Sequence, residues 1–188
     1  MSVVLTKKYE APPINKDEIL RYALCEETNT ATLSLLDECL EEILSKLVYK
    51  VCFIEASLDE YFNSYSSSLF KKYLADCDKY IIFAATVGIE VDRLISKYSH
   101  ISPAKAFMFQ AIGAERIEAL CDAFALDTQK EYKHTKPRIS AGYGDMPLEM
   151  QKEVFSVLDC PRKIGLSLNN SMLMSPTKSV TAFIGVLK

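Results

Sequence analysis

The sequence predicts an α+β fold in which mixed helices surround a mostly antiparallel, twisted sheet. Helical and strand-like segments do not alternate regularly, as they would in a parallel sheet. Helical patterns dominate early, and a group of short strand-like segments closes the chain. The 188 residues suit a single domain, residues 1–188. A chain of this length buries roughly 70% of its unfolded surface, so it needs no disulfide or metal for stability.

Helix starts are the clearest local signals. Asn15 is a predicted N-cap, because Glu18 follows three residues later and an apolar pattern begins there. Pro103, preceded by a serine, starts a predicted helix that reaches about Tyr132. Gly113 inside this helix costs about 1 kcal/mol relative to Ala, which indicates a close contact with another element. Helices are expected over 15–24, 30–47, 67–75, 89–97, 103–132 and 147–158.

Strands are predicted where apolar runs are rich in β-branched and aromatic residues. The stretch 48–54 alternates, and the continuous run 80–87, which Gly88 ends, has the length of a buried strand. The first 13 residues end in a Pro–Pro pair and are expected to form an arm. Short strands are expected near 164–169, 171–175 and 179–186.

The charges and apolar runs exclude several classes of partner. There are 22 Lys and Arg against 25 Asp and Glu, a net charge of −3, so we expect no nucleic-acid partner. The longest apolar run, 80–89, is far shorter than the ~20 residues that a membrane helix needs. The first ten residues hold no apolar core of signal-peptide length. We therefore expect a cytoplasmic protein with no membrane association.

The cysteines and histidines argue against a metal centre. None of the six Cys forms a C-x-x-C pair, so we expect reduced, mostly buried thiols. His100 and His134 are far apart and lie in polar, loop-like contexts, which also disfavours a nucleophile that needs a His base. The G-x-S-x-G, P-loop and dinucleotide-binding patterns do not occur in the sequence.

The loop 136–147 is the best candidate for ligand binding. Gly142 and Gly144 let the backbone approach a ligand closely or adopt positive φ. Arg138 offers a planar set of donors suited to a carboxylate, and Tyr143 offers a ring face and a hydroxyl. Pro147 is expected to start the next helix. Composition alone leaves a plain surface turn as the other interpretation.

Three acids in the long helix form a second candidate. Glu115, Glu118 and Asp122 share one helical face by their spacing. They could form a solvated face paired with Arg116 or Lys130. Alternatively, one of them faces a pocket and meets a cationic ligand.

At these two segments the sequence resembles the activation domain of cobalamin-dependent methionine synthase, which binds S-adenosylmethionine. The family signature R-x-x-x-G-Y-x-x-x-P has its counterpart at Arg138–Pro147, and the family's acidic helix segment at Glu118–Asp122. Region 80–188 looks like the family core, whereas 1–75 has no clear match. A third match, in the family's paired strands, comprises Gly165-Leu-Ser-Leu, Ser171, Met174, Pro176 and Ser179-Val180.

The resemblance implies a role for each matched residue. Arg138 would hold the carboxylate of the methionine moiety, and Tyr143 would pack on the ligand and orient it. Glu118 would lie near the ribose or the cationic sulfonium. The backbone groups expected to meet the ligand belong to Ser140, Ala141 and Gly142.

The resemblance also implies a function. The protein would be a stand-alone reactivation subunit of methionine synthase, with no turnover alone, in methionine biosynthesis. It would bind S-adenosylmethionine for the reductive methylation of cob(II)alamin carried by a partner, either methionine synthase or another corrinoid protein. Flavodoxin or ferredoxin would supply the electron.

Two departures from the family pattern leave an alternative open. The family's N-terminal acid has only Asp17, Glu18 and Asp37 as candidates, and the family's aromatic tail has no counterpart before Lys188. The alternative is a module that binds a corrinoid protein and has lost S-adenosylmethionine binding. A self-sufficient methyltransferase is disfavoured, because a catalytic base and a Gly-rich fingerprint are missing.

Overall fold

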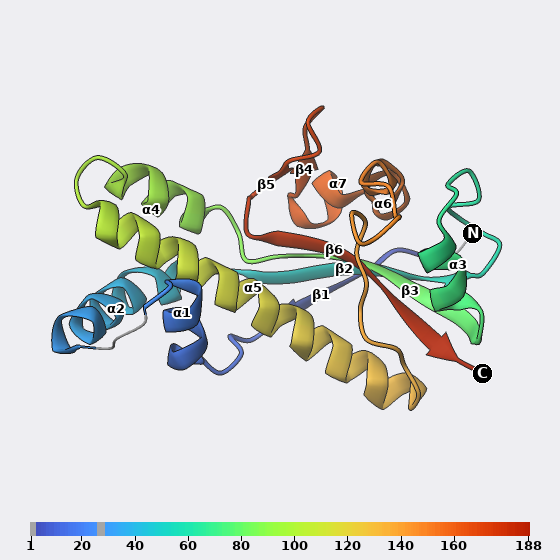
Figure 1. Ribbon diagram of the computed structural model, residues 1–188, viewed down its shortest axis with the longest axis horizontal. Coiled ribbons are helices and arrows are strands. Elements are labelled where there is room, and N and C mark those ends of the chain that lie inside the picture. The colour runs from blue at the N-terminus through green and yellow to red at the C-terminus, as the bar shows by residue number, and fades with distance from the viewer. Residues whose placement is uncertain (1–2, 26–28) are drawn as a thin grey trace.

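A four-stranded antiparallel sheet with helices on both faces forms the centre of the computed structural model, which describes residues 3–25 and 29–188 (Figure 1). The strand order is β1-β2-β3-β6, and each neighbouring pair is antiparallel. The α+β prediction with a mostly antiparallel sheet is therefore confirmed. The strands are β1 (Leu5–Tyr9), β2 (Tyr49–Ser57), β3 (Cys77–Thr86) and β6 (Ser179–Leu187), with a separate hairpin of β4 (Ser167–Leu168) and β5 (Met174–Ser175).

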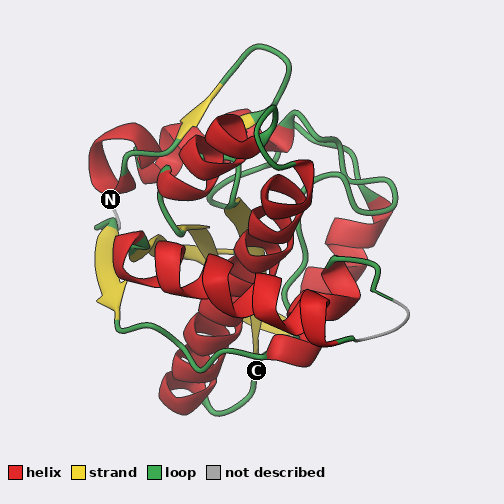
Figure 2. Ribbon diagram, turned by 90° about the vertical axis from the view of Figure 1, so that its left-hand side faces the viewer, coloured by secondary structure: helices red, strands yellow, loops and turns green. Residues whose placement is uncertain are grey.

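The helices divide between the two faces of the sheet. They are α1 (Lys16–Tyr22), α2 (Thr30–Ile43), α3 (Ser68–Leu74), α4 (Glu90–Tyr98), α5 (Pro103–Tyr132), α6 (Met150–Leu158) and α7 (Cys160–Ile164). Val51 and Phe83 belong to a core with α1, α2, α4 and α5. Ile54 and Ile82 point the other way and pack with α3, α6 and α7. The alternation of strand side chains thus produces two apolar cores, one on each face. From the end that carries α2 and α4, helices stand in front of the central part of the sheet (Figure 2).

Several local predictions are confirmed at atomic detail. The side chain of Asn15 accepts a hydrogen bond from the amide of Glu18 at 3.1 Å, as an N-cap does. The long helix runs from Pro103 to Tyr132 as predicted. A Cβ built on Gly113 would lie 2.8 Å from side-chain atoms of both Lys178 and Val91, so the close contact is present.

The N-terminal arm is a correction. Residues 5–9 form strand β1, which pairs with β2 from Leu5↔Phe53 to Tyr9↔Tyr49. The sequence hides this strand because it lies at the sheet edge and exposes most of its side chains, including Lys7 and Lys8. A strand whose side chains are mostly exposed shows no alternating apolar pattern, so periodicity does not mark it.

The predicted helix at 147–158 begins later, at Met150, because residues 147–149 first form a turn. The amide of Met150 bonds to the carbonyl of Pro147 at 3.2 Å. The strand expected at 164–169 is only Ser167–Leu168, because residues 160–164 form α7 after a left-handed Asp159 at φ 49°. The helix predicted to reach 47 ends at Ile43 and continues as a 3₁₀ turn, Leu44–Lys46.

Burial agrees with the expectation for the thiols, since five of the six cysteines are buried and Cys25 is half-buried. Among the described residues, no helix combines the length and the apolar character needed to cross a membrane.

Candidate functional site

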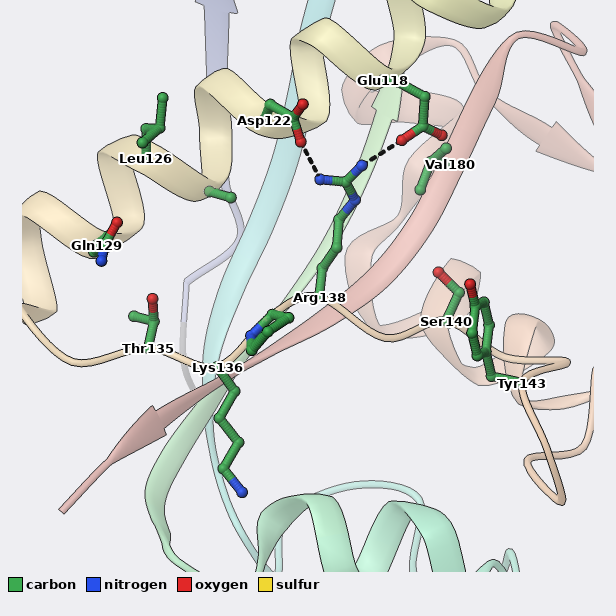
Figure 3. Close-up of a pocket in the computed structure, with 12 residues that line it drawn as sticks. Glu118, Asp122, Leu126, Gln129, Thr135, Lys136, Arg138, Ser140, Tyr143 and Val180 are labelled. Carbon is green, nitrogen blue, oxygen red and sulfur yellow. Dashed lines mark hydrogen bonds and ion pairs between the residues drawn. The ribbon is translucent and has the colours of Figure 1, made fainter. Parts of the chain in front are cut away.

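An open groove of about 820 Å³ lies between α5, the segment 135–143 and β6 (Figure 3). Its volume is within the range of small-molecule sites in proteins. Side chains from α5 form one wall, and the segment that follows α5 forms the other. The residues that line it are Glu118, Asp122, Ala125, Leu126, Gln129, Thr135, Lys136, Pro137, Arg138, Ser140, Tyr143 and Val180.

Hydrogen bonds to β6 fix the backbone on both sides of Arg138. The amide of Lys136 donates to the carbonyl of Gly185 at 2.8 Å. Ile139 and Phe183 exchange two backbone hydrogen bonds, of 3.0 and 2.8 Å. Ile139 packs against the core of the α3, α6 and α7 face, whereas Arg138 lines the groove. Arg138 is thus held between two anchored residues.

Tyr73 adds a third anchor beneath this segment. Its hydroxyl donates to the carbonyl of Pro137 at 2.8 Å and accepts from the amide of Gly185 at 2.9 Å. Burial raises the pKa of Tyr73 to about 12. The phenol therefore stays protonated, and keeps its hydrogen bond to Pro137, up to a higher pH than an ordinary tyrosine would.

Arg138 is the electrostatic centre of the groove. Its guanidinium donates to the carboxylates of Glu118 and Asp122, which lie one helical turn apart on α5 (Figure 3). Burial lowers the pKa of Arg138, but the hydrogen bond to Asp122 and the nearby acidic charges outweigh this effect and raise it. Two carboxylates and one guanidinium leave a net negative charge. The remaining N–H groups of Arg138 make no hydrogen bond to any residue in the described ranges.

The acidic face of α5 therefore serves two separate purposes. Glu115 is buried and pairs with Arg116, which was one of the predicted partners. Glu118 and Asp122 pair with Arg138, not with Lys130. Lys130 instead pairs with Asp127 of the same helix.

The signature loop is a closed turn with an exposed tyrosine. The amide of Tyr143 donates to the carbonyl of Ser140 at 3.2 Å, and the amide of Gly142 donates to that of Met146 at 3.0 Å. Gly142 has φ 90°, a conformation that favours glycine. Tyr143 is 66% exposed and Ala141 is buried.

Four of the six predicted site residues line the groove: Glu118, Arg138, Ser140 and Tyr143. Ala141 and Gly142 build the turn instead, and the amide of Gly142 is already engaged within it.

Sequence reasoning missed the far end of the groove. Leu126 and Gln129 continue the face of Glu118 and Asp122 at helical spacing, so the periodicity of α5 is the signal that could have found them. Lys136 also lines the groove, while its amine pairs with Asp76.

The N-terminal acids proposed for the ligand do not line this groove. Glu18 pairs with Arg21, and Asp37 pairs with Lys16 at 2.6 Å. Asp17 lies on a separate hollow.

The groove offers recognition but little nucleophilic chemistry. Its lining contains no cysteine or histidine, and the neighbouring thiol of Cys121 is buried, which raises its pKa to about 12. In the part of the chain that the structure describes, no three His, Cys, Asp or Glu side chains gather as a metal site would require. The arrangement is suited to holding a ligand that carries both a carboxylate and a cation.

Comparison with known proteins supports the fold. Among solved structures, the chain is similar to the MetH reactivation domain bound to AdoHcy, with a TM-score of 0.69 and 12% sequence identity. The similarity covers 98% of this chain and 78% of that chain. No family model matches the sequence, and no curated protein matches it. The fold expected from the resemblance at Arg138–Pro147 is therefore confirmed.

Proposed function

We propose that this protein binds S-adenosylmethionine in the groove beside Arg138 and presents its methyl group to cobalamin on a partner module. The observation that carries the proposal is that the predicted residues of two different segments meet in one groove. Glu118 comes from α5, whereas Arg138, Ser140 and Tyr143 come from the following segment. The similar fold that holds AdoHcy supports the same ligand class here.

The charges of the ligand suit those of the groove. S-adenosylmethionine carries a carboxylate, an ammonium and a sulfonium. The carboxylate can take the N–H groups of Arg138 that the acids leave unused, because a guanidinium forms several hydrogen bonds at once. The cationic groups are then balanced by Glu118 and Asp122, which outnumber Arg138.

The chain itself has the tasks of holding and orienting the donor. Methyl transfer breaks the bond between sulfur and the methyl carbon and releases the thioether, S-adenosylhomocysteine. Cobalamin on the partner would supply the nucleophilic cobalt, once reduced by one electron from a flavodoxin- or ferredoxin-type donor. The absence of a cysteine or histidine from the groove lining agrees with a nucleophile that comes from outside.

We assign the protein accordingly to the reactivation of methionine synthase or of a related corrinoid protein. Its direct test is the conversion of cob(II)alamin to methylcobalamin on a partner synthase. Conversion should require this protein, S-adenosylmethionine and a reductant together. Conversion that proceeds equally well without this protein contradicts the assignment.

Calorimetry tests the ligand separately from the partner. Arg138→Ala should weaken binding of S-adenosylmethionine about 10- to 100-fold, since a hydrogen bond to a charged group contributes about 1.5–3 kcal/mol. Arg162→Ala is the matched control, because Arg162 is an exposed arginine paired with Asp159 outside the groove. Absence of heat with the wild-type protein at millimolar ligand refutes the proposal.

The second candidate function is a corrinoid-protein partner without a ligand. The pairing of Arg138 with two acids of its own chain favours it, because the guanidinium is already neutralised. Capture of a purified cobalamin-binding module that is the same with and without S-adenosylmethionine supports this candidate. Capture that strengthens with the ligand supports the first.

A further inference from the structure

Asp145, which is not one of the signature positions, connects the loop 140–146, called the groove loop below, to a different part of the chain. Asp145 accepts hydrogen bonds from the hydroxyl of Ser67 at 2.6 Å, the amide of Ser68 at 2.8 Å and the amide of Leu69 at 3.1 Å. The hydroxyl of Ser68 donates to it as well. All four donors belong to the start of α3.

On the loop side, Asp145 lies inside the turn that carries the groove residues. The amide of its neighbour Met146 donates to the carbonyl of Tyr143 at 2.9 Å, and Met146 is buried. The preceding Gly144 has φ 54°, and a Cβ there would lie 2.8 Å from the side chain of Leu69. The turn therefore follows the surface of α3 closely at two adjacent positions.

On the helix side, α3 is a rigid support. The ring of Phe70 packs against Phe183 at 5.1 Å and against Tyr80 at 6.0 Å between centroids. Both partners lie in the central sheet and are buried. A loop attached to α3 is therefore attached to the core.

Capping alone does not explain Asp145. The helix already has an N-cap, because the hydroxyl of Ser67 accepts from the amide of Phe70 at 3.0 Å. The hydrogen bonds from the two serines and the two amides hold the pKa of Asp145 well below its usual range, so the carboxylate stays ionised to a lower pH than an ordinary aspartate.

We infer that Asp145 is a positioning residue that sets the groove loop, and with it Tyr143, for ligand binding. The role in ligand binding rests on the proposed function. The order of the loop does not, and it can be measured without any ligand.

Hydrogen exchange of the ligand-free protein is the first test. Asp145→Ala should speed the exchange of amides at 140–146 as well as those at the start of α3. Asp145→Asn should restore part of the protection, since its side-chain oxygen can still accept from Ser67 and Leu69. Asp159→Asn is the control, an aspartate that pairs on the surface with Arg162 and does not line the groove. Faster exchange in α3 with an unchanged 140–146 overturns the inference.

Calorimetry with S-adenosylmethionine is the second test. Asp145→Ala should weaken binding roughly 5- to 30-fold, because the ligand must then order the backbone of about one more residue. An affinity within twofold of wild type, with the protein folded, overturns the positioning role. Ser68→Ala removes a donor and keeps Asp145, so it serves if Asp145→Ala does not fold. Where even the wild type binds no ligand, the proposed function fails and the exchange experiment alone decides the inference.

Discussion

Arg116→Ala should destabilise this protein more than most single substitutions. The side chain of Arg116 is fully buried. Its guanidinium pairs with Glu115 and donates to the carbonyls of Pro12 and Pro13 at 2.7 Å each. Glu115 in turn accepts from the amide of Asn15 at 3.1 Å. The pair thus fastens the chain between β1 and α1 onto the middle of α5.

The magnitude follows from what the substitution leaves behind. Glu115 is 3% exposed and would remain as a buried carboxylate without its cation. Breaking one partner out of a buried ion pair costs about 3–5 kcal/mol. The two proline carbonyls also lose their donors, although local opening of the arm can hydrate them. We expect a loss of about 3–5 kcal/mol, against a typical total of roughly 5–15 kcal/mol.

Urea denaturation followed by far-ultraviolet circular dichroism measures this loss, and the absence of Trp makes dichroism preferable to fluorescence. The double variant Glu115→Gln, Arg116→Met removes both charges and should cost clearly less than Arg116→Ala. Arg162→Ala, at an exposed ion pair, should change stability by less than about 0.5 kcal/mol. A loss below about 1 kcal/mol for Arg116→Ala, or a double variant as unstable as the single one, refutes the reasoning.

Three further predictions concern packing, titration and thiol access. Gly113→Ala should lower the stability by about 1 kcal/mol in urea denaturation, because overpacking against Lys178 and Val91 outweighs the gain in helix propensity. The pKa of Tyr73 is raised from about 10 in the unfolded chain to about 12 in the fold. Its contribution to the free energy of unfolding is therefore fully present below about pH 10 and is lost as the pH rises toward 12. Tyr73→Phe should therefore lessen the alkaline loss of stability. A thiol reagent should modify Cys25 rapidly in the native protein, and the five buried cysteines only after unfolding.

The elements that the sequence predicted best are those with local signals. The Asn15 cap and the proline at position 103 mark helix starts through contacts within a few residues, so no tertiary information is needed. Strand β1 has no such signal, since its partner residues in β2 are 40 to 48 residues away. Helix α7 follows Asp159, whose backbone is left-handed. An aspartate at this position does not by itself predict that conformation, so the start of α7 could not be predicted.

Part of the candidate site was predictable in its residues, but its far end and its pairing were not. The spacing in α5 placed Glu118 and Asp122 on one face, and the loop signature marked Arg138. That these three side chains meet depends on how the segment after α5 lies along β6, which is a tertiary contact. The same holds for Asp145, whose partners on α3 lie more than 70 residues earlier.

The segment that carries Arg138 also occupies one border of the sheet. Residues 135 and 139 bridge to Val186 and Phe183 of β6, so this strand from Phe183 onward does not offer its outer hydrogen-bonding groups to a strand from another molecule. At the opposite border, Lys7 and Lys8 on β1 discourage such pairing by their charge. A cleavage or substitution that detaches the segment would therefore leave backbone groups of β6 unpaired and open to strands of other molecules. It would also remove one wall of the groove. The ligand binding proposed above and resistance to aggregation therefore rely on the same few hydrogen bonds, and a ligand that tightens the segment should keep the protein monodisperse for longer.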